Sequence, residues 1–370
     1  MGKKVRHSGR GRKALAVLAH EEAFVGVDVH KATYSVSVWT EERGEVARWV
    51  QPAAPMALAR RLAGIRPQVA QVVYEAGPTG FALARTLRAQ GLPAEVIASS
   101  KMPVARGPSN KSDRLDAQHL AELAAKGLLK TVYVPTEQEE ADRQVVRRRH
   151  QVVRERRRVK HRIKSFLLQH HLPSPAGLER WSLAAVAALA EMPVGPELRW
   201  SLDGLLADLA HFEHQLAAAT SALAELGRAE RHASAVALLR GVPGVGPVTA
   251  LTFRTELPRP ERFATGAELA SYVGLAPLVR RSGTTTRRGP IVKAGNGTLR
   301  SVLVEAAWSW VRCDPSARAV YGRLLANTAL SQKAVVGVAR RLAMVLWRVV
   351  TTGEVYRPGD AAARDDELAL

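Results

Sequence analysis

Cysteine is almost absent from this sequence, and long apolar runs are missing altogether. The single cysteine, Cys313, excludes a disulfide within the chain and any zinc site built on several cysteines. No apolar run reaches the roughly 18 residues that a membrane-spanning helix needs. The basic start of the chain has too short an apolar stretch, and no convincing cleavage site, for a secretory signal peptide. We therefore expect a cytoplasmic protein with no membrane partner.

Acidic residues are scarce relative to basic ones, with 34 Asp and Glu against 54 Lys and Arg, which gives a net charge of +20. Such an excess predicts a polyanionic partner, most simply nucleic acid, although charge alone leaves open a basic protein without one. Apolar residues make up 46% of the 370 residues. They suffice for packed cores in two or three domains, which excludes disorder throughout the chain.

The apolar pattern divides the chain into zones. Residues 1–21 are basic and aperiodic, and residues 353–370 end in an acidic stretch of small residues, so we expect both ends to be disordered. Between them, residues 22–134 alternate strand and helix patterns, whereas 137–232 read as almost wholly helical. Residues 236–352 form a C-terminal domain that is mostly helical and rich in glycine near its start.

The first of these zones has the pattern of an α/β domain. Strands are expected at 24–30, 32–39, 45–51, 70–76 and 94–99, and helices at 56–65, 81–91 and about 112–126. Three strands, expected to be antiparallel, thus precede alternating helices and strands. This is the order of a ribonuclease-H-like fold, and it requires a sheet covered by helices.

Four carboxylates stand out in this zone. Asp28 sits in FVGVDVH, near the end of an otherwise apolar strand, and Glu75 closes QVVYEA before a GPTG turn. Because burying a lone carboxylate is costly, each should face a site or hold a cation. Asp113 and Asp116 lie three residues apart, on one face of the first turn of a helix. For this second pair alone, ordinary first-turn acids favoured by the helix dipole are the alternative.

Clustered carboxylates need positive charge to stay ionised, and ligands that are all oxygen favour Mg²⁺ or Mn²⁺. Two such ions can flank a scissile phosphate and stabilise the attacking and leaving oxygens. A basic chain with an acidic cluster therefore predicts phosphodiester chemistry, in which the acids hold metal and the basic surfaces hold the strand.

The most basic stretch is 143–164, which has eleven Arg or Lys and one acid, Glu155. An apolar residue recurs every seven positions along it, at Val145, Val152, Val159 and Phe166. With a second helical stretch at 203–227, this seam predicts an antiparallel coiled-coil arm or a dimer seam. Crowded cations repel one another unless phosphates lie nearby, although a solvated charged face is the alternative. The residues expected to contact nucleic acid are Arg147, Arg148, Arg156 and Arg157.

Two motifs follow in the C-terminal domain. GVPGVGPVTALTF places Gly244 and Gly246 between apolar helical runs, as in a helix-hairpin-helix whose glycines let backbone N–H groups approach a phosphate. A plain tight turn is the alternative. The middle of residues 268–308 is then predicted to be a loop, flanked by helices, that is dense in cations and hydroxyls. A merely flexible basic loop is the alternative. Its basic residues, further candidates for nucleic-acid contacts, are Arg280, Arg281, Arg287, Arg288 and Lys293.

Three motifs of the α/β zone, GVDVHK (26–31), YEAGPTG (74–80) and NKSDRLDAQHLAEL (110–123), carry a resemblance. They are similar to the Asp-Glu-Asp-Asp motifs of the RuvC-like domain in transposases of the insertion sequence 110 family. The resemblance implies that four residues are the catalytic, metal-binding acids: Asp28, Glu75, Asp113 and Asp116.

The C-terminal segments SYVGLAPLVRRSG, GPIVKAGN and LRSVLVEAA resemble the transposase domain of the same family. There the resemblance implies Ser282 as the catalytic serine, with Lys293 and Arg300 as its helpers. A serine hydroxyl is a poor nucleophile until a base or a metal helps, and a covalent phosphoserine would conserve the energy of the broken strand. Competing hydroxyls are Ser271, Thr284, Thr285 and Thr286.

The function that the resemblance implies is that of a nucleoid-associated DNA transposase, a recombinase guided by a structured non-coding bridge RNA. Because strand exchange must hold several strands together, we expect a homodimer that assembles into a tetramer, paired through the apolar seam. Two alternatives remain. One is a RuvC-like endonuclease that cuts branched DNA with metal-activated water, and the other is a non-catalytic nucleic-acid-binding protein.

Overall fold

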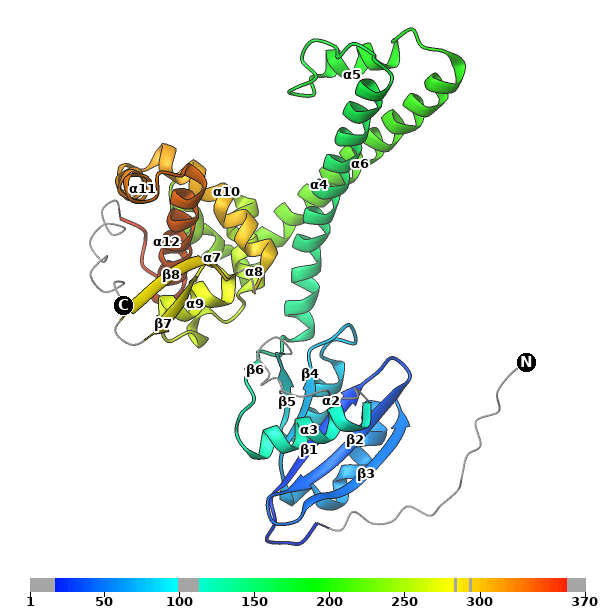
Figure 1. Cartoon of the computed structure of the whole chain (residues 1–370), viewed down its shortest axis with the longest axis vertical. Helices are drawn as coiled ribbons and strands as arrows, with labels where there is room; N and C mark the ends of the chain where they lie inside the picture. Colours follow the sequence, from blue (N-terminus) through cyan, green and yellow to red (C-terminus); the bar gives the residue numbers. More distant parts are fainter. Residues whose placement is uncertain (1–16, 99–112, 283–284, 293–294, 358–370) are drawn as a thin grey trace. The chain divides into compact units, whose positions relative to one another are not determined.

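The computed structural model describes residues 17–98, 113–282, 285–292 and 295–357; for 113–115, 279–282 and 285–288 it describes the backbone alone. The chain divides into two compact units, Met1–Thr136 and Glu137–Leu370, each with its own core (Figure 1). In the described residues, no helix combines the length and the apolar character that crossing a bilayer requires.

A mixed six-stranded sheet forms the centre of the first unit. Its strands are β1 (Ala23–Val29), β2 (Thr33–Thr40), β3 (Gly44–Pro52), β4 (Val69–Glu75), β5 (Ala94–Ile97) and β6 (Thr131–Val132). They lie in the order β3-β2-β1-β4-β5-β6. The first three strands are antiparallel, as predicted, β4 is parallel to β1 and β5, and β6 is antiparallel to β5. The sequence pattern did not predict β6.

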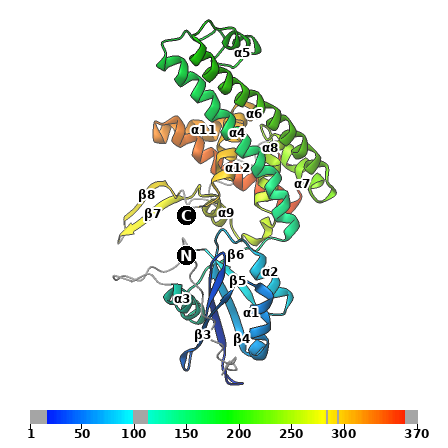
Figure 2. The same ribbon diagram turned by 90° about the vertical axis from the view of Figure 1, so that its right-hand side faces the viewer.

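Helices cover both faces of this sheet (Figure 2). One face carries α1 (Pro55–Leu62), the 3₁₀ helix η1 (Ala63–Gln68) and α2 (Ala82–Ala89). Leu62 and Leu87 are fully buried there, in one cluster with residues of β1 and β4. The other face carries α3 (Asp113–Ala125), whose Leu120 and Ala124 pack against Val73 of β4.

The second unit begins with an arm of two long antiparallel helices, α4 (Glu137–Gln169) and α6 (Pro196–Arg228), with the short α5 (Leu183–Ala190) between them in sequence. Arg149 of α4 contacts Thr220 of α6, and Arg156 contacts Glu213, so the residue numbers run in opposite directions. This confirms the helical middle of the chain and favours the coiled-coil arm over the dimer seam.

The predicted pairing of two chains through the seam is therefore corrected. Val152 and Val159 are 1% exposed, and the seam packs within the chain, against α6 and the C-terminal helices. An apolar stripe that is already covered in this way does not offer a surface to a second copy.

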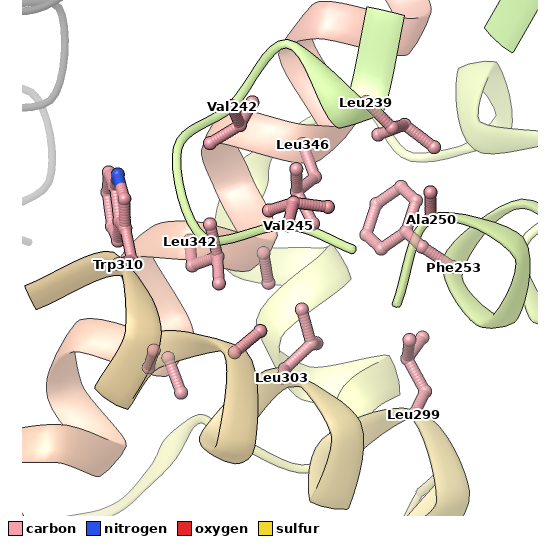
Figure 3. Close-up of a cluster of buried hydrophobic side chains, with 14 of the residues drawn as sticks. Leu239, Val242, Val245, Ala250, Phe253, Leu299, Leu303, Trp310, Leu342 and Leu346 are labelled. Carbon is pink, nitrogen blue, oxygen red and sulfur yellow. The ribbon is translucent and has the colours of Figure 1, made fainter. Parts of the chain in front are cut away.

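The rest of the second unit is a helical bundle with one β-hairpin. Its elements are α7 (Glu230–Arg240), α8 (Pro247–Glu256), the 3₁₀ helix η3 (Pro260–Arg262), α9 (Gly266–Val273), β7 (Pro277–Ser282), β8 (Thr285–Ile291), α10 (Gly297–Cys313), α11 (Pro315–Thr328) and α12 (Ser331–Thr352). Figure 3 shows the core, in which Phe253, Leu303, Trp310 and Leu342 converge from α8, α10 and α12.

The predicted disordered ends, 1–21 and 353–370, each include residues that belong to folded structure. Glu21 is 2% exposed and forms an ion pair with Arg43, which ties the start of β1 to the β2–β3 turn. Tyr356 is 7% exposed, and its hydroxyl donates to Asp314 at 2.9 Å. Both residues belong to folded structure because a buried polar group needs such a partner. Residues 1–16 and 358–370 lie outside the described residues.

Candidate functional site

Asp28 and Glu75 lie at the carboxyl ends of adjacent parallel strands. Val27 of β1 is paired with Tyr74 of β4, and Asp28 and Glu75 each follow by one residue. Residues at matching positions of parallel strands point to the same face, with the strands about 4.8 Å apart. The structure therefore brings these two predicted acids together.

The face of the sheet follows from the alternation along β1. Val27 and Tyr74 are fully buried in the core beneath α1 and α2, so Asp28 and Glu75 face α3. Gly26 lies on this face too, and α3 packs directly onto it. A Cβ added to Gly26 would collide with the carbonyl oxygen of Ala117 and would lie 2.7 Å from the amide nitrogen of Ala121.

The direction of α3 brings its first turn towards the two acids. Phe24, at the start of β1, packs against the cluster that holds Leu120 and Ala124, whereas Gly26 meets Ala117. The helix thus runs antiparallel to β1, and its start lies on the side of Asp28. That first turn carries Asp113 and Asp116. Asp116 is exposed, and Asp113 is described by its backbone alone.

His30 is a neighbour of the acids that the sequence reasoning did not single out. Its Nε2 lies 3.0 Å from Oδ2 of Asp28, and the two side chains are 45% and 20% exposed. Since alternate strand residues share a face, its position two residues after Asp28 was a usable signal.

The donor set in this unit suits a hard divalent cation, because strand-end carboxylates offer oxygen ligands only. Among the side chains that the structure describes, no three His, Cys, Asp or Glu groups are grouped closely enough to hold a metal ion. Asp113 is not among those side chains. Convergence of all four acids on one ion therefore stays a prediction.

Ser282 is the last residue of β7 and pairs with Thr285, the first residue of β8. The predicted loop is thus a β-hairpin at its centre, because main-chain pairing of the two basic segments satisfies their backbone groups. Arg280 pairs with Arg287, and Val279 pairs with Arg288. Of the other candidates in this segment, Arg281 pairs with Thr286, Ser271 is exposed on α9, and Lys293 and Thr284 lie outside the described residues.

The two glycines of the α7–α8 turn have different surroundings. Gly244 has φ +79°, and a Cβ there would lie 2.7 Å from the backbone nitrogen of Trp310 in α10. This glycine is therefore needed for close packing within the bundle, which supports the tight-turn alternative for it. Gly246 caps α8, is exposed and has no atom within 4 Å of an added Cβ.

The four arginines predicted to contact nucleic acid on α4 also differ. Arg147 donates two hydrogen bonds to Glu256, at 2.8 and 3.0 Å, and these bonds raise the pKa of Arg147. Arg156 pairs with Glu213 at 3.0 Å. Arg148 and Arg157 are exposed, although Arg148 also reaches the side chain of Gln215. Arg147 thus has a structural ion pair that the charge pattern alone did not indicate.

The cations of α4 are nevertheless crowded enough to affect one another. Burial and, next, the charge of Arg156 lower the pKa of Arg149. On the side of α4 away from the seam, Arg154, Arg157 and Lys164 are all exposed. Because they recur at helical spacing, they share one face of the helix, and we name these three the exposed α4 cations.

Comparisons with known proteins agree with both units. A family model described as "Transposase IS116/IS110/IS902 family" matches residues 236–322, and an IS110-type DEDD model described as "Transposase" matches residues 25–172. The curated protein "Putative transposase y4qE" of Sinorhizobium fredii is 35% identical over 311 residues, which are 80% of this chain and 73% of the relative. The transposase for insertion sequence element IS1111A of Coxiella burnetii is 26% identical over 281 residues, 74% of this chain and 76% of the relative. The chain therefore belongs to the IS110 family of insertion-sequence transposases, and it is an enzyme of DNA strand transfer.

Proposed function

We propose that this transposase breaks and rejoins DNA through a covalent bond to Ser282, with the help of a divalent cation held by Asp28, Glu75, Asp113 and Asp116. The observation that carries the proposal is the placement of Asp28 and Glu75. Both end adjacent parallel strands on the face covered by α3, whose first turn carries the other two acids. We take the first unit to be a ribonuclease-H-like, RuvC-like domain on the same grounds.

In the proposed step, Oγ of Ser282 forms a bond to phosphorus while one phosphorus–oxygen bond of the strand breaks. The serine proton is lost, and the departing deoxyribose oxygen takes up a proton. Rejoining reverses this exchange with a new strand, so no external energy source is needed. A bound Mg²⁺ or Mn²⁺ would neutralise charge on the phosphate and polarise its oxygens.

The hairpin register suggests which arginines support the serine. Residues two apart on a strand belong to one face, and paired residues of an antiparallel ladder share it. Arg280, its partner Arg287 and Ser282 therefore occupy one face of the hairpin, whereas Arg281 and Arg288 occupy the other. We assign charge-assisted contacts with the attacked phosphate to the first pair.

A denaturing gel with labelled element DNA and Mg²⁺ tests the serine. We expect a protein–DNA adduct with the wild type, none with Ser282→Ala, and an unchanged amount with the control Ser271→Ala. Arg280→Gln with Arg287→Gln should reduce the adduct more than Arg281→Gln with Arg288→Gln, which removes equal charge. An adduct that persists in Ser282→Ala, or that maps to Thr285, contradicts the serine assignment.

The second candidate is a RuvC-like nuclease that uses metal-activated water, and the complete carboxylate-bearing sheet of the first unit is the observation that favours it. This candidate predicts that Ser282→Ala still cuts DNA and that no adduct forms with any variant. The non-catalytic alternative is set aside, because the family models and relatives are transposases.

Two further parts of the proposal concern partners. We propose that a structured bridge RNA from the element guides the enzyme, with the exposed α4 cations supplying part of the electrostatic attraction. Assembly into a dimer and then a tetramer on nucleic acid also stays a proposal, through surfaces other than the covered seam. Light scattering of the protein alone and of its active DNA complex tests the assembly, and a monomer in both contradicts it.

A further inference from the structure

Glu256 is a buried carboxylate of the second unit that the proposed chemistry does not use. It ends α8 and is 1% exposed. Arg147 of α4 donates to both of its oxygens, and Nε of Arg143 lies 3.5 Å from Oε2. A helix C-terminus is an unfavourable place for a negative charge, and a buried carboxylate needs cationic partners to offset its loss of solvation. The ion pair between Arg147 and Glu256 joins α4 to α8.

Asn296 connects the same carboxylate to the serine-bearing hairpin. Its Nδ2 donates to Oε2 of Glu256 at 2.7 Å, and its Oδ1 accepts from the backbone nitrogen of Leu299 at 3.0 Å, which caps α10. Asn296 follows the end of β8 in the chain and precedes the first residue of α10. Through this side chain Glu256 therefore contacts the connection between β8 and α10, five residues after the end of β8. We call this part of the connection, Gly295 and Asn296, the exit of the hairpin.

The chain is held tightly at this exit. Gly295 has φ +128°, and a Cβ there would collide with the carbonyl oxygen of Tyr272. The backbone nitrogen of Asn296 donates to that same carbonyl at 3.1 Å. The hydroxyl of Tyr272 in turn donates to the backbone carbonyl of Glu256 at 3.3 Å. The exit of the hairpin, the end of α9 and the end of α8 thus form one joint.

We propose that Glu256 is a positioning residue for strand cleavage, because through Asn296 it fixes the exit of the β7–β8 hairpin and through Arg147 it fixes that exit to α4. The proposal rests on the proposed function, in which Ser282 of this hairpin is the nucleophile. It gives Arg147 a role in this joint in place of a phosphate contact. Position matters here, since a reacting group misplaced by about 1 Å can react about 10²-fold more slowly.

Asp142 provides a matched control. It is 4% exposed, accepts two hydrogen bonds from Arg231 at 2.7 and 2.9 Å, and lies 2.8 Å from Nε2 of His232. Like Glu256, it is a buried carboxylate that joins α4 to another helix, here α7. The partners of Asp142 belong to α4 and α7, whereas those of Glu256 include Asn296 at the exit of the hairpin. Neutralising Asp142 therefore weakens the unit without touching the joint.

The experiment compares Glu256→Gln with Asp142→Asn in the full-length enzyme. Single-turnover cleavage of labelled element DNA is measured at saturating DNA with Mg²⁺, together with DNA affinity and Tm. We expect Glu256→Gln to slow cleavage by about 10- to 100-fold with an unchanged Kd for DNA. Asp142→Asn should lower Tm at least as much and keep the cleavage rate within about twofold of wild type.

A swap variant separates positioning from simple loss of structure. Asn296→Asp places two carboxylates against each other and should slow cleavage as Glu256→Gln does. Combining Asn296→Asp with Glu256→Gln restores a carboxylate–amide pair in the reverse order and should recover part of the rate. If Glu256→Gln does not fold, Asn296→Ser supplies the same readout, because serine retains the cap of α10.

Cleavage by Glu256→Gln at the wild-type rate, or equal slowing in Asp142→Asn, overturns the proposal. So does a swap variant that recovers nothing while its Tm returns to that of the wild type. Failure of the proposed function is distinguishable in the same assay, since it shows as cleavage that survives Ser282→Ala whatever Glu256→Gln does.

Discussion

The two units of this transposase use their carboxylates differently. In the second unit, Asp142 and Glu256 are buried, and each receives hydrogen bonds from an arginine. In the first unit, Glu75 is half-buried, Asp116 is exposed, and among the described side chains no ion pair joins either one to an arginine or lysine. A carboxylate whose lone pairs are occupied by guanidinium holds helices together, whereas one that keeps its oxygens accessible can take a metal ion.

The largest expected effect comes from neutralising Asp28 and Glu75, the two strand-end acids of the first unit. Asp28→Asn or Glu75→Gln should slow Mg²⁺-dependent strand cleavage by about 10³-fold or more, because the site loses a charged ligand of the cation. Glu75→Gln should leave Tm unchanged, since among the described side chains no ion pair joins Glu75 to an arginine or lysine. Cleavage kinetics and thermal unfolding of the same samples check this. Full cleavage with a lowered Tm would place these acids with the structural set.

Neutralising a buried carboxylate of the second unit should instead lower the stability of the protein. Asp142→Asn leaves Arg231 and His232 without their anionic partner and should reduce the free energy of unfolding by about 2–4 kcal/mol. Urea unfolding of the full-length protein measures the change. A free energy of unfolding within about 0.5 kcal/mol of the wild type would show that this ion pair contributes little.

The cations of α4 divide in the same way as the carboxylates. Replacing the exposed α4 cations Arg154, Arg157 and Lys164 by Gln should lower the slope of log affinity against log salt by up to about 3, with a loss of affinity at low salt. Replacing Arg147 and Arg156, which pair with carboxylates, should change the slope less and the stability more. Equal slopes for the two sets, measured by nucleic-acid binding at several salt concentrations, contradict the division.

A substitution at Gly26 tests whether the acids of the first unit depend on the close packing of α3 against β1. Gly26→Ala forces the first half of α3 away from β1 and should cost about 1–3 kcal/mol, with a matching loss of Mg²⁺-dependent cleavage. Gly64→Ala in the same unit is the control, because an added Cβ there meets nothing within 4 Å. Urea unfolding and cleavage assays on both variants decide it. If Gly26→Ala changes neither the free energy of unfolding nor the cleavage rate, α3 does not pack closely against β1.

The smallest expected effect is in the pH dependence of stability. Burial opposes ionisation of Asp142, but hydrogen bonds led by that from Arg231 outweigh it and lower its pKa from 3.8 to about 2. A lowered folded pKa stabilises the protein above about pH 4, and this contribution disappears as pH falls towards 2. The stability difference between wild type and Asp142→Asn should therefore shrink as the pH falls from about 4 towards 2. A difference that grows over the interval from about pH 4 to 2 contradicts this sign.

Much of the first unit could be predicted from the sequence, because local patterns determine it. Apolar strands at 24–30 and 70–76 that each end in an acid place those acids at neighbouring strand ends once the strands are parallel. The two-residue β6 lacks any such pattern. It forms only because β5 offers a free edge, which is information that a local segment does not contain.

The second unit was harder to predict, because long-range contacts decide the roles of its residues. Arg147 and Glu256 are 109 positions apart, so an arginine inside a basic run gave no sign of its ion pair. The seven-residue seam correctly indicated a paired helix, but periodicity does not say whether the partner is α6 or a second chain. The hairpin at 277–291 reads as a loop because charged and turn-forming residues interrupt any alternation.

The most direct test of the account is to identify the residue that carries the DNA. Wild-type enzyme, Asp28→Asn and Ser282→Ala are incubated with element DNA and Mg²⁺, the DNA is digested, and the modified peptide is mapped by mass spectrometry. The account predicts a nucleotide on Ser282 in the wild type and on no residue in either variant, because the proposed mechanism requires both the serine and the metal-binding acids. A nucleotide on another hydroxyl, or an adduct on Ser282 that forms at the wild-type rate in Asp28→Asn, would contradict it.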